Sequence, residues 1–307
     1  MHAPPRYIPP WRDQGVLITH STCPQLGRTT EGEEMNIRRT LLGAAAGIIV
    51  TGSVQVQAIP IATELMLLAD VSGSLDTTDF NLQRDGYEAA FRNANVINAI
   101  ESVGGIAVSL AYWSESAQTA VGWTTLTDSA SSNAFADLIA AAARPNNVGN
   151  GTGMANAMNF GANEIANNGY EGSNVVVDVS GDGADSIACS STANCAAVQT
   201  ARDFLLNSGV DRVNALWIED EAQPSSRKFF CLDASCNINP LDYGSTNVIG
   251  GTGSFQQVAS NFDDFSDAIA SKIEREIVPQ VPLPSTVLLF GLGLAGLGWT
   301  SRRKQRS

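Results

Sequence analysis

The chain has 307 residues, of which 31 are acidic and 18 are basic, and its formal net charge is −13 at pH 7. An acidic chain of this kind repels phosphate backbones and anionic lipid surfaces, which argues against nucleic-acid binding and peripheral membrane binding. The only histidines are His2 and His20, so residues 21–307 contain none. These residues therefore offer no histidine for a Ser-His-Asp or Cys-His arrangement or for a zinc site.

The first 58 residues carry targeting information. Arg38-Arg39 opens a positively charged segment, an apolar stretch follows, and Val56-Gln57-Ala58 has small residues at the two positions that a signal peptidase reads. We therefore expect a signal peptide over residues 35–58, with translation starting at Met35 and residues 1–34 as a misassigned upstream extension. The alternative is a buried helix, but such a helix has no reason to begin with two arginines and to end in a cleavage-like site.

Strands and helices are expected to alternate along residues 59–280, the folded body. In chain order, the predicted elements are a strand at 64–69, a helix at 78–93, a strand at 105–113, an edge strand at 119–123, helices at 129–142 and 154–166, a strand at 174–179, a helix at 193–207, a strand at 212–218 and a helix at 263–277. Residues 219–247 show no clear period and are predicted to form a long ordered loop. The alternation predicts an α/β fold with a Rossmann-like, doubly wound, mostly parallel sheet and helices on both faces.

The first predicted strand ends in Asp70-Val71-Ser72-Gly73-Ser74. In open parallel sheets, ligands bind just beyond the carboxyl ends of the strands. The motif places three oxygen side chains at alternate positions, and Gly73 allows them to converge. Oxygen-only ligands favour Mg²⁺ or Mn²⁺ over zinc. The same residue types also form ordinary strand-to-helix turns in which Ser or Asp caps the next helix, so this motif alone leaves both interpretations open.

Two later loops add further oxygen side chains. Gly149-Asn150-Gly151-Thr152-Gly153 precedes a predicted helix, and a second apolar strand ends in Asp178-Val179-Ser180-Gly181-Asp182-Gly183. The three loops together resemble the metal-ion-dependent adhesion site of von Willebrand factor type A domains. The resemblance implies five metal-site residues: Asp70, Ser72, Ser74, Thr152 and Asp182. In that family the hydroxyls contact the metal, the aspartates act directly or through water, and a carboxylate of the ligand often completes the coordination.

The resemblance extends over about residues 61–278. Three longer motifs, Gln83-Arg84-Asp85-Gly86-Tyr87, Asp178-Val179-Ser180-Gly181-Asp182-Gly183 and Val248-Ile249-Gly250-Gly251, are similar to a secreted bacterial branch of the family whose activity is not established. The resemblance therefore implies a von Willebrand A-like fold and bound Mg²⁺ or Mn²⁺, but it names no ligand.

The cysteines fit an exported protein. Cys23 lies in the leader, which leaves Cys189, Cys195, Cys231 and Cys236 in the body. An even set in an oxidising compartment predicts disulfides, with three possible pairings. We favour the two short loops, Cys189 with Cys195 and Cys231 with Cys236. A zinc site is the less favoured alternative because neither pair has the two-residue spacing of zinc knuckles.

The C-terminal end, residues 281–307, has three parts. They are Val281-Pro282-Leu283-Pro284-Ser285, an apolar segment from Val287 to Trp299, and the basic cluster Arg302-Arg303-Lys304-Gln305-Arg306. This tail resembles the PEP-CTERM sorting signal of Gram-negative bacteria, although Leu283 replaces the glutamate that gives the signal its name. The resemblance implies cleavage near the proline motif by an exosortase. We expect a precursor held in the inner membrane by the apolar segment, and then delivery of the body to the cell surface or extracellular matrix.

Taken together, the sequence predicts a secreted or surface-associated, metal-dependent adhesion or protein-binding module that is not an enzyme. Its partner is expected to be a protein or matrix ligand that binds through a carboxylate. One alternative is a structural matrix protein that the metal only stabilises. The other is a metal-dependent hydrolase, because Asp178, Asp182 and Asp185 cluster in sequence, although Asp178 suits a strand equally well and Asp185 a solvated turn.

Overall fold

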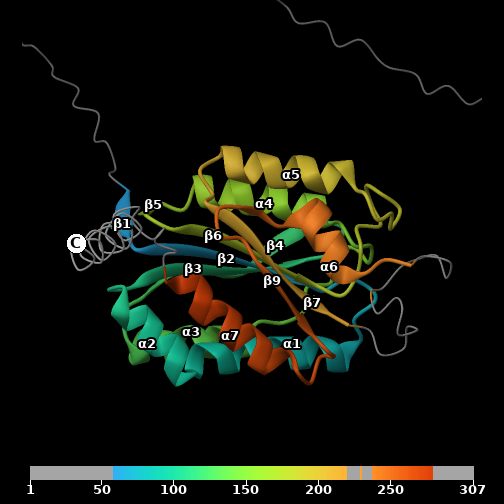
Figure 1. Ribbon diagram of the computed structural model, residues 1–307. Helices are drawn as coiled ribbons and strands as arrows, with labels where there is room; N and C mark the ends of the chain where they lie inside the picture. Colours follow the sequence, from blue (N-terminus) through green and yellow to red (C-terminus); the bar gives the residue numbers. More distant parts are fainter. Residues whose placement is uncertain (1–57, 220–228, 230–236, 279–307) are drawn as a thin grey trace, which may run out of the picture. The chain divides into compact units, whose positions relative to one another are not determined.

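The computed structural model describes residues 58–219, 229 and 237–278 (Figure 1). The strands are β1 (Ile59–Ile61), β2 (Thr63–Asp70), β3 (Ile106–Trp113), β4 (Ala117–Leu126), β5 (Tyr170–Gly172), β6 (Val175–Gly181), β7 (Arg212–Ile218), β8 (Gly250–Gly251) and β9 (Gln256–Ala259). The helices are α1 (Thr77–Arg92), α2 (Ala94–Ser102), α3 (Ser129–Ala141), α4 (Met154–Ala166), α5 (Ala196–Asn207), α6 (Pro240–Tyr243), the π-helix η1 (Gly244–Val248) and α7 (Phe265–Ile277).

Seven strands form one sheet in the order β4-β3-β2-β6-β7-β8, and β9 also pairs with β7. Strands β3, β2, β6, β7 and β9 pair in parallel, whereas β4 and β8 pair antiparallel with their neighbours. The fold class predicted from the sequence, a Rossmann-like α/β fold with a mostly parallel sheet and helices on both faces, is confirmed. The parallel strands bring their carboxyl ends to one edge of the sheet.

The central strand β2 is buried on both faces, as its apolar run from Leu65 to Ala69 predicts. Successive side chains of a strand point to opposite faces. Leu65 and Leu67 pack in a core with α1, α2, α3 and α7, while Met66 and Leu68 pack in a second core with α4 and α5. Figure 1 shows these two groups of helices on opposite sides of the sheet. Each face of the sheet therefore has its own apolar core.

Helix α2 was not predicted from the sequence. The helix expected at 78–93 ends at Arg92, and a second helix begins at Ala94. Asn93 between them has extended backbone angles of φ −68° and ψ 131°, and its side chain accepts a hydrogen bond from the Asn95 backbone N–H at 2.8 Å. One asparagine thus ends α1 and caps α2. The period of apolar residues alone did not reveal this break.

The predicted loop at 219–247 is also partly wrong. Within its described residues, α6 lies at Pro240–Tyr243 and η1 begins at Gly244. The short strands β8 and β9 that follow, and the separate pair β1 and β5, were not predicted either. These strands have two to four residues, which is too short for a period of two to stand out in the sequence.

Helices α1 and α7 approach each other closely at Gly86. A Cβ atom placed there would lie 2.6 Å from Cδ1 of Phe265, whose ring packs edge-on against Tyr87 with centroids 5.2 Å apart. We therefore expect Gly86→Ala to lower the free energy of unfolding by about 1–3 kcal/mol through overpacking. Urea denaturation measures this change.

The matched control is Gly161→Ala in α4. There the added Cβ would lie 3.4 Å from Cδ1 of Leu68, an ordinary contact. Alanine is the better helix former, so this variant should be more stable than wild type by about 0.5–1 kcal/mol. Equal stabilisation by both substitutions would contradict the close approach of α1 and α7.

Candidate metal site

The candidate site begins where β2 ends, at Asp70. Its side chain is fully buried, and Oδ1 accepts a hydrogen bond from the Ser72 backbone N–H at 2.7 Å. The Gln83 side chain of α1 donates to the Asp70 carbonyl oxygen at 2.8 Å, which fixes the end of the strand. Oδ2 is buried and has no hydrogen-bond partner. A buried carboxylate oxygen without a partner is costly unless a cation or a proton reaches it.

The hydroxyls of the first loop lie beside this carboxylate and connect it to the third loop. Ser72 Oγ and Ser74 Oγ are 3.1 Å apart, and Ser74 Oγ donates to Asp182 Oδ1 at 2.8 Å. Asp182 directly follows β6, the parallel neighbour of β2. The structure therefore brings four of the five predicted residues together through direct contacts.

Thr152, the fifth residue, is positioned by its backbone. Its N–H donates to Ser186 Oγ at 2.9 Å, and its carbonyl accepts from the Ser186 N–H at 2.8 Å. The Gly73 N–H donates to the carbonyl of Asn150 at 2.7 Å, so the second loop is tied to both the first and the third. Within the described part of the chain, no hydrogen bond joins the Thr152 hydroxyl to the other four predicted residues.

Burial raises the pKa of the Asp70 carboxyl from 3.8 to about 7, and the Ser72 hydrogen bonds, the positive charge of Arg144 and the backbone N–H of Asp182 offset only part of this rise. Removing a carboxylate from water disfavours its charged form. A divalent cation at Oδ2 would restore the charged form. The donor chemistry of the five residues, two carboxylates and three hydroxyls, fits a hard cation such as Mg²⁺ or Mn²⁺.

Arg144, just after α3, is a residue that the sequence analysis missed. Its Nη2 donates to the carbonyl oxygens of Val71, Ser72 and Leu75, each at 2.9 Å, and its Nη1 donates to that of Asp76 at 3.2 Å. The planar guanidinium has enough donors to hold one whole turn of backbone. Nothing in the sequence around Arg144 marks this role, because the contacts depend on where α3 ends in space.

Asp185 is buried, which corrects the prediction of a solvated turn. Its Oδ2 accepts from the Ala155 N–H at 3.1 Å, and its Oδ1 accepts from the Ala188 N–H at 2.7 Å. Its own N–H donates to the hydroxyl of Tyr243 at 3.0 Å. Asp185 therefore caps the first turn of α4, directly after the Thr152 loop. An acidic residue that caps a helix from a distant loop has no local sequence pattern.

Asp178, the remaining carboxylate of the predicted cluster, lies within β6 and not in the site loops. It is fully buried, and its Oδ1 lies 2.5 Å from Nζ of Lys272 on α7. The grouping of Asp178, Asp182 and Asp185 by sequence is therefore divided by the structure among an ion pair, the candidate metal site and a helix cap.

Cys189 and Cys195 form a disulfide in the third loop with an S–S distance of 2.00 Å. The second predicted disulfide, Cys231 with Cys236, lies outside the described residues. The predicted signal peptide also lies outside them, as do the sorting-signal residues Val281, Pro282, Pro284, Arg302 and Arg303. None of the described helices has the length and apolar character that a membrane crossing requires.

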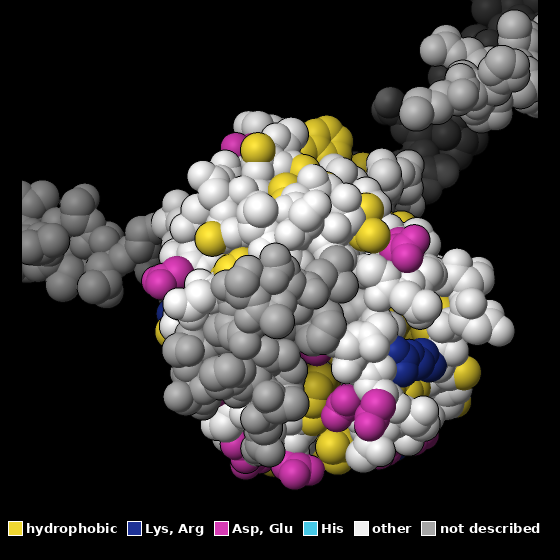
Figure 2. All heavy atoms as spheres, turned by 90° about the vertical axis from the view of Figure 1, so that its right-hand side faces the viewer, with side chains coloured by type: hydrophobic (Ala, Val, Ile, Leu, Met, Phe, Trp, Pro, Cys, Tyr) yellow, Lys and Arg dark blue, Asp and Glu magenta, His cyan; other side chains and the backbone are white. Residues whose placement is uncertain are grey.

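The edge that carries the three loops faces the viewer in Figure 2. Acidic side chains are spread over the described part of this face, and basic side chains gather mainly at one place. Among the described residues, no group of three or more His, Cys, Asp or Glu side chains lies together as a metal site would require. A cation at this edge would therefore depend on hydroxyl ligands in addition to Asp70 and Asp182.

Two family models match the chain. One, described as "Protein of unknown function (DUF1194)", matches residues 60–281. The other, the PEP-CTERM protein-sorting motif, matches residues 280–304, which confirms the resemblance inferred from the tail. No curated protein matches the chain.

Several solved structures are similar to the chain at low sequence identity. A von Willebrand factor type A protein from Catenulispora acidiphila is 12% identical, with a TM-score of 0.49 over 71% of this chain and 43% of that one. An aerotolerance-related membrane protein from Bacteroides fragilis is 19% identical, with a TM-score of 0.45 over 70% and 98%. Proximal thread matrix protein 1 from the mussel byssus, with a zinc-occupied MIDAS motif, is 12% identical, with a TM-score of 0.43 over 72% and 47%. The chain spans less than half the length of the first and the third.

The guanidinium of Arg144 should be required to hold the first loop. Arg144→Met removes the donors of four hydrogen bonds, and we expect a loss of about 1.5–3 kcal/mol in the free energy of unfolding. The control is Arg92→Met, because Arg92 forms exposed ion pairs with Glu88 and Asp137 that should contribute less than about 1 kcal/mol. Similar losses in both variants, measured by urea denaturation, would show that Arg144 acts only as a surface charge.

The pKa of Asp70 predicts a pH dependence in metal-free protein. Because the folded-state pKa is about 7 and the ordinary value is 3.8, the folded state binds the extra proton between these pH values. Stability from this group is therefore full below about pH 4 and falls as the pH rises through 7, by on the order of 2–4 kcal/mol.

Asp70→Asn removes this contribution, so the free energy of unfolding of wild type minus that of the variant should decrease from pH 4 to pH 8 in the presence of a chelator. Taking the difference cancels the pH-dependent contributions of Asp178 and Glu276 to stability, since both groups are present in both proteins and burial raises their pKa values too. A difference that does not change with pH would contradict the buried, unpaired state of Oδ2.

Proposed function

The chain belongs to the DUF1194 family of proteins of unknown function, and we propose that its folded body is an exported, metal-dependent adhesion or protein-binding module. The observation that carries the proposal is Asp70 Oδ2, buried without a hydrogen-bond partner beside the hydroxyls of Ser72 and Ser74. In this proposal Asp70, Ser72, Ser74, Thr152 and Asp182 hold Mg²⁺ or Mn²⁺. The bound cation supplies a positive centre to which an acidic group of a partner can coordinate.

Each part of the site has a task that favours binding over catalysis. Three of the five donors are neutral hydroxyls, so they leave more of the cation's charge uncompensated than carboxylates would. Asp182 accepts a hydrogen bond from Ser74, which spreads its negative charge away from the cation. An under-neutralised cation attracts a carboxylate of a partner. We assign no catalytic residue, and the body we propose has no histidine to act as a general base.

The structural-matrix alternative, in which the metal only stabilises the loops, has less support. Direct hydrogen bonds already join the three loops, from Gly73 to Asn150, from Ser74 to Asp182 and from Thr152 to Ser186. Arg144 holds the first loop in addition. A cation is therefore not needed to bring the loops together, and what the site lacks is a partner for Oδ2.

For localisation, the sorting motif at residues 280–304 supports export in a Gram-negative bacterium. We propose that the signal peptide is cleaved after Ala58, that the apolar tail holds the precursor in the inner membrane, and that an exosortase-type enzyme cuts near the proline motif. The body would then reach the cell surface or extracellular matrix, where an adhesion module meets its partner.

Metal binding is tested by thermal unfolding with and without Mg²⁺ or Mn²⁺. A ligand present at about 100 times its Kd stabilises the folded state by about 2.7 kcal/mol, which for a body of this size is a Tm increase of roughly 5–10 °C. Asp70→Asn should abolish this increase. The matched control is Asp76→Asn in the same loop. Asparagine keeps the Oδ1 acceptor that caps α1, so this variant should retain the metal response and a baseline Tm near that of wild type. An equal metal response in wild type and Asp70→Asn would refute the site.

Partner binding is tested with immobilised extracellular material from the producing bacterium. We expect retention of the wild-type protein in Mg²⁺, release by a chelator, and no retention after the carboxyl groups of the material are amidated. Retention that survives both treatments would exclude carboxylate coordination as the binding mode. A metal-dependent Tm increase with no chelator-sensitive retention would instead favour the structural-matrix alternative.

A further inference from the structure

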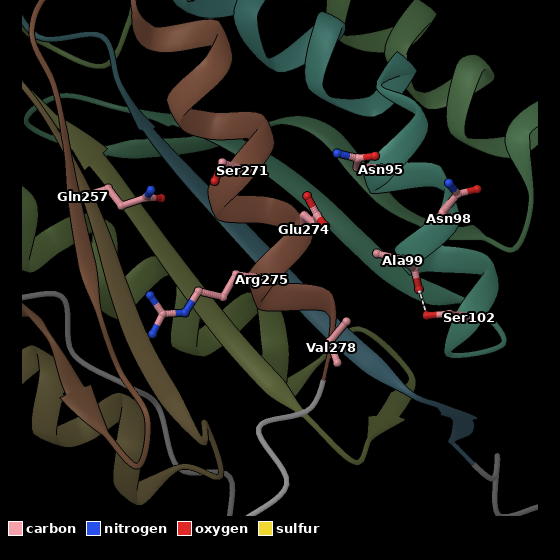
Figure 3. Close-up of a pocket in the computed structure, with 9 residues that line it drawn as sticks. All are labelled: Asn95, Asn98, Ala99, Ser102, Gln257, Ser271, Glu274, Arg275 and Val278. Carbon is pink, nitrogen blue, oxygen red and sulfur yellow. Dashed lines mark hydrogen bonds between the residues drawn. The ribbon is translucent and has the colours of Figure 1, made fainter.

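Helix α7 has two faces of different chemistry. Its outer face lines an open pocket of about 740 Å³ between α2, α7 and β9, with Ser271, Glu274 and Arg275 among the lining residues (Figure 3). Its inner face carries Lys272 and Glu276, whose side chains have no exposed surface. The lysine is therefore enclosed between the helix and the sheet, where an unpaired ammonium would be very costly.

Lys272 meets two carboxyl groups in this enclosed space. Its Nζ lies 2.5 Å from Asp178 Oδ1 on β6 and also contacts Glu276 Oε1, one helical turn along α7. Asn214 of β7 donates to the same Glu276 oxygen at 2.8 Å, which holds that carboxyl in place. The other oxygens of both acids, Asp178 Oδ2 and Glu276 Oε2, are buried without hydrogen-bond partners. The three groups have little freedom to move apart.

Water has little access to this cluster. The ring of Phe255 covers Lys272 with Nζ 5.5 Å from its centroid, and the Arg275 guanidinium stacks on the same ring at 3.7 Å. Tyr87 of α1, which is fully buried, bonds to Ser180 at 2.9 Å, one alternate position beyond Asp178 on β6. The remaining nearby cation, Arg212, donates to the Glu276 carbonyl at 3.1 Å and not to either carboxyl.

In so dry a space, the neutral form of a carboxylic acid is favoured over its ion. Burial raises the pKa of Asp178, and burial together with the negative charge of Asp178 raises the pKa of Glu276 to about 7. Transfer of the ammonium proton to Asp178 gives a neutral amine next to a neutral carboxylic acid. This is the pair of groups that condenses to an amide when held in contact.

We propose that Lys272 and Asp178 become joined by an intramolecular isopeptide bond and that Glu276 carries the proton for this reaction. The neutral Nζ attacks Cγ of the protonated Asp178, and a C–N bond forms. The Glu276 carboxylate takes a proton from the nitrogen and gives it to the departing hydroxyl, and the Cγ–O bond breaks. One water leaves, no group is oxidised or reduced, and Glu276 returns to its starting state. Glu276 touches the reacting nitrogen and is therefore the catalytic residue of this step.

The bond would give the body a covalent path for mechanical load. The sorting motif at residues 280–304 follows α7 directly in sequence, so tension on the C-terminal end of the chain acts first on this helix. An amide from Lys272 to Asp178 passes the tension to β6, a central strand of the sheet. Without the bond, only non-covalent contacts resist the removal of α7: packing, the ion pair and the hydrogen bonds at the end of the helix.

The test is the intact mass of the full chain, purified, reduced and alkylated under denaturing conditions. We expect a mass lower than that of the sequence by one water, and a branched peptide that joins the segment containing Asp178 to the segment containing Lys272, with no tryptic cleavage after Lys272. An unmodified mass, with the two segments recovered separately, would overturn the proposal. So would a loss of water that peptide mapping places at an Asp-Gly pair such as Asp85-Gly86 or Asp182-Gly183, where a cyclic imide forms.

Variants test the chemistry. Glu276→Gln keeps the shape of the side chain but removes the proton carrier, so the unmodified mass is expected. The matched control is Glu274→Gln on the outer face of α7, which should lose one water like wild type. Asp178→Asn should lose ammonia in place of water, because the leaving group is now an amide nitrogen. A water loss from Asp178→Asn, or a wild-type extent of bonding in Glu276→Gln, would contradict the assigned roles.

Discussion

The burial of carboxylates in the two central strands is the constraint on which the rest of the structure depends. Strands β2 and β6 are covered on both faces, so a polar side chain on either strand must find its partner inside the protein. At the end of β2, Asp70 has one oxygen bonded to the backbone and one oxygen without a partner. Within β6, the carboxylate of Asp178 forms an ion pair with Lys272. The two carboxylates have different partners and therefore different chemistry.

The difference follows from depth in the sheet. Asp70 lies at the carboxyl edge, where three loops converge, and we propose that a bound cation compensates its second oxygen. Asp178 lies on the face of the sheet that α7 covers. There, only another side chain or a proton can neutralise its negative charge. A cation that comes and goes suits a binding site, whereas a permanent internal partner suits a structural link. This is the physical reason for proposing reversible metal binding at the first and a covalent bond at the second.

The sequence predicted the parts that depend on local pattern. The apolar runs at 65–69 and 175–177 identified β2 and β6, and the Asp-x-Ser-x-Ser motif identified the loop that leaves β2. The break at Asn93 was missed because an asparagine that both ends one helix and caps the next interrupts no apolar period. Short strands such as β8 were missed because they hold two residues and depend on β7 for their pairing.

Within the candidate site, the sequence named the residues proposed to bind the metal but not those that hold them. Ser72, Ser74 and Asp182 were named through the resemblance to the metal-ion-dependent adhesion site, which rests on oxygen side chains in the loops that follow apolar strands. Arg144 and Asp185 could not, because each acts on backbone from a distant segment: Arg144 on the loop after β2, and Asp185 on the first turn of α4. Supporting contacts of this kind form only in the completed fold, so no sequence motif of fixed spacing predicts them.

Strand β6 connects the two regions. Asp178, Ser180 and Asp182 occupy alternate positions along it and just beyond its end, and such positions share one face of a strand. Each meets a different element: Asp178 meets Lys272 of α7, Ser180 meets the Tyr87 hydroxyl of α1, and Asp182 meets Ser74 of the first loop. A shift of β6 along its axis would break all three contacts together. The position of α7 and the geometry of the candidate metal site are therefore set by one strand, and a load that reaches β6 through α7 acts on the same element that positions Asp182.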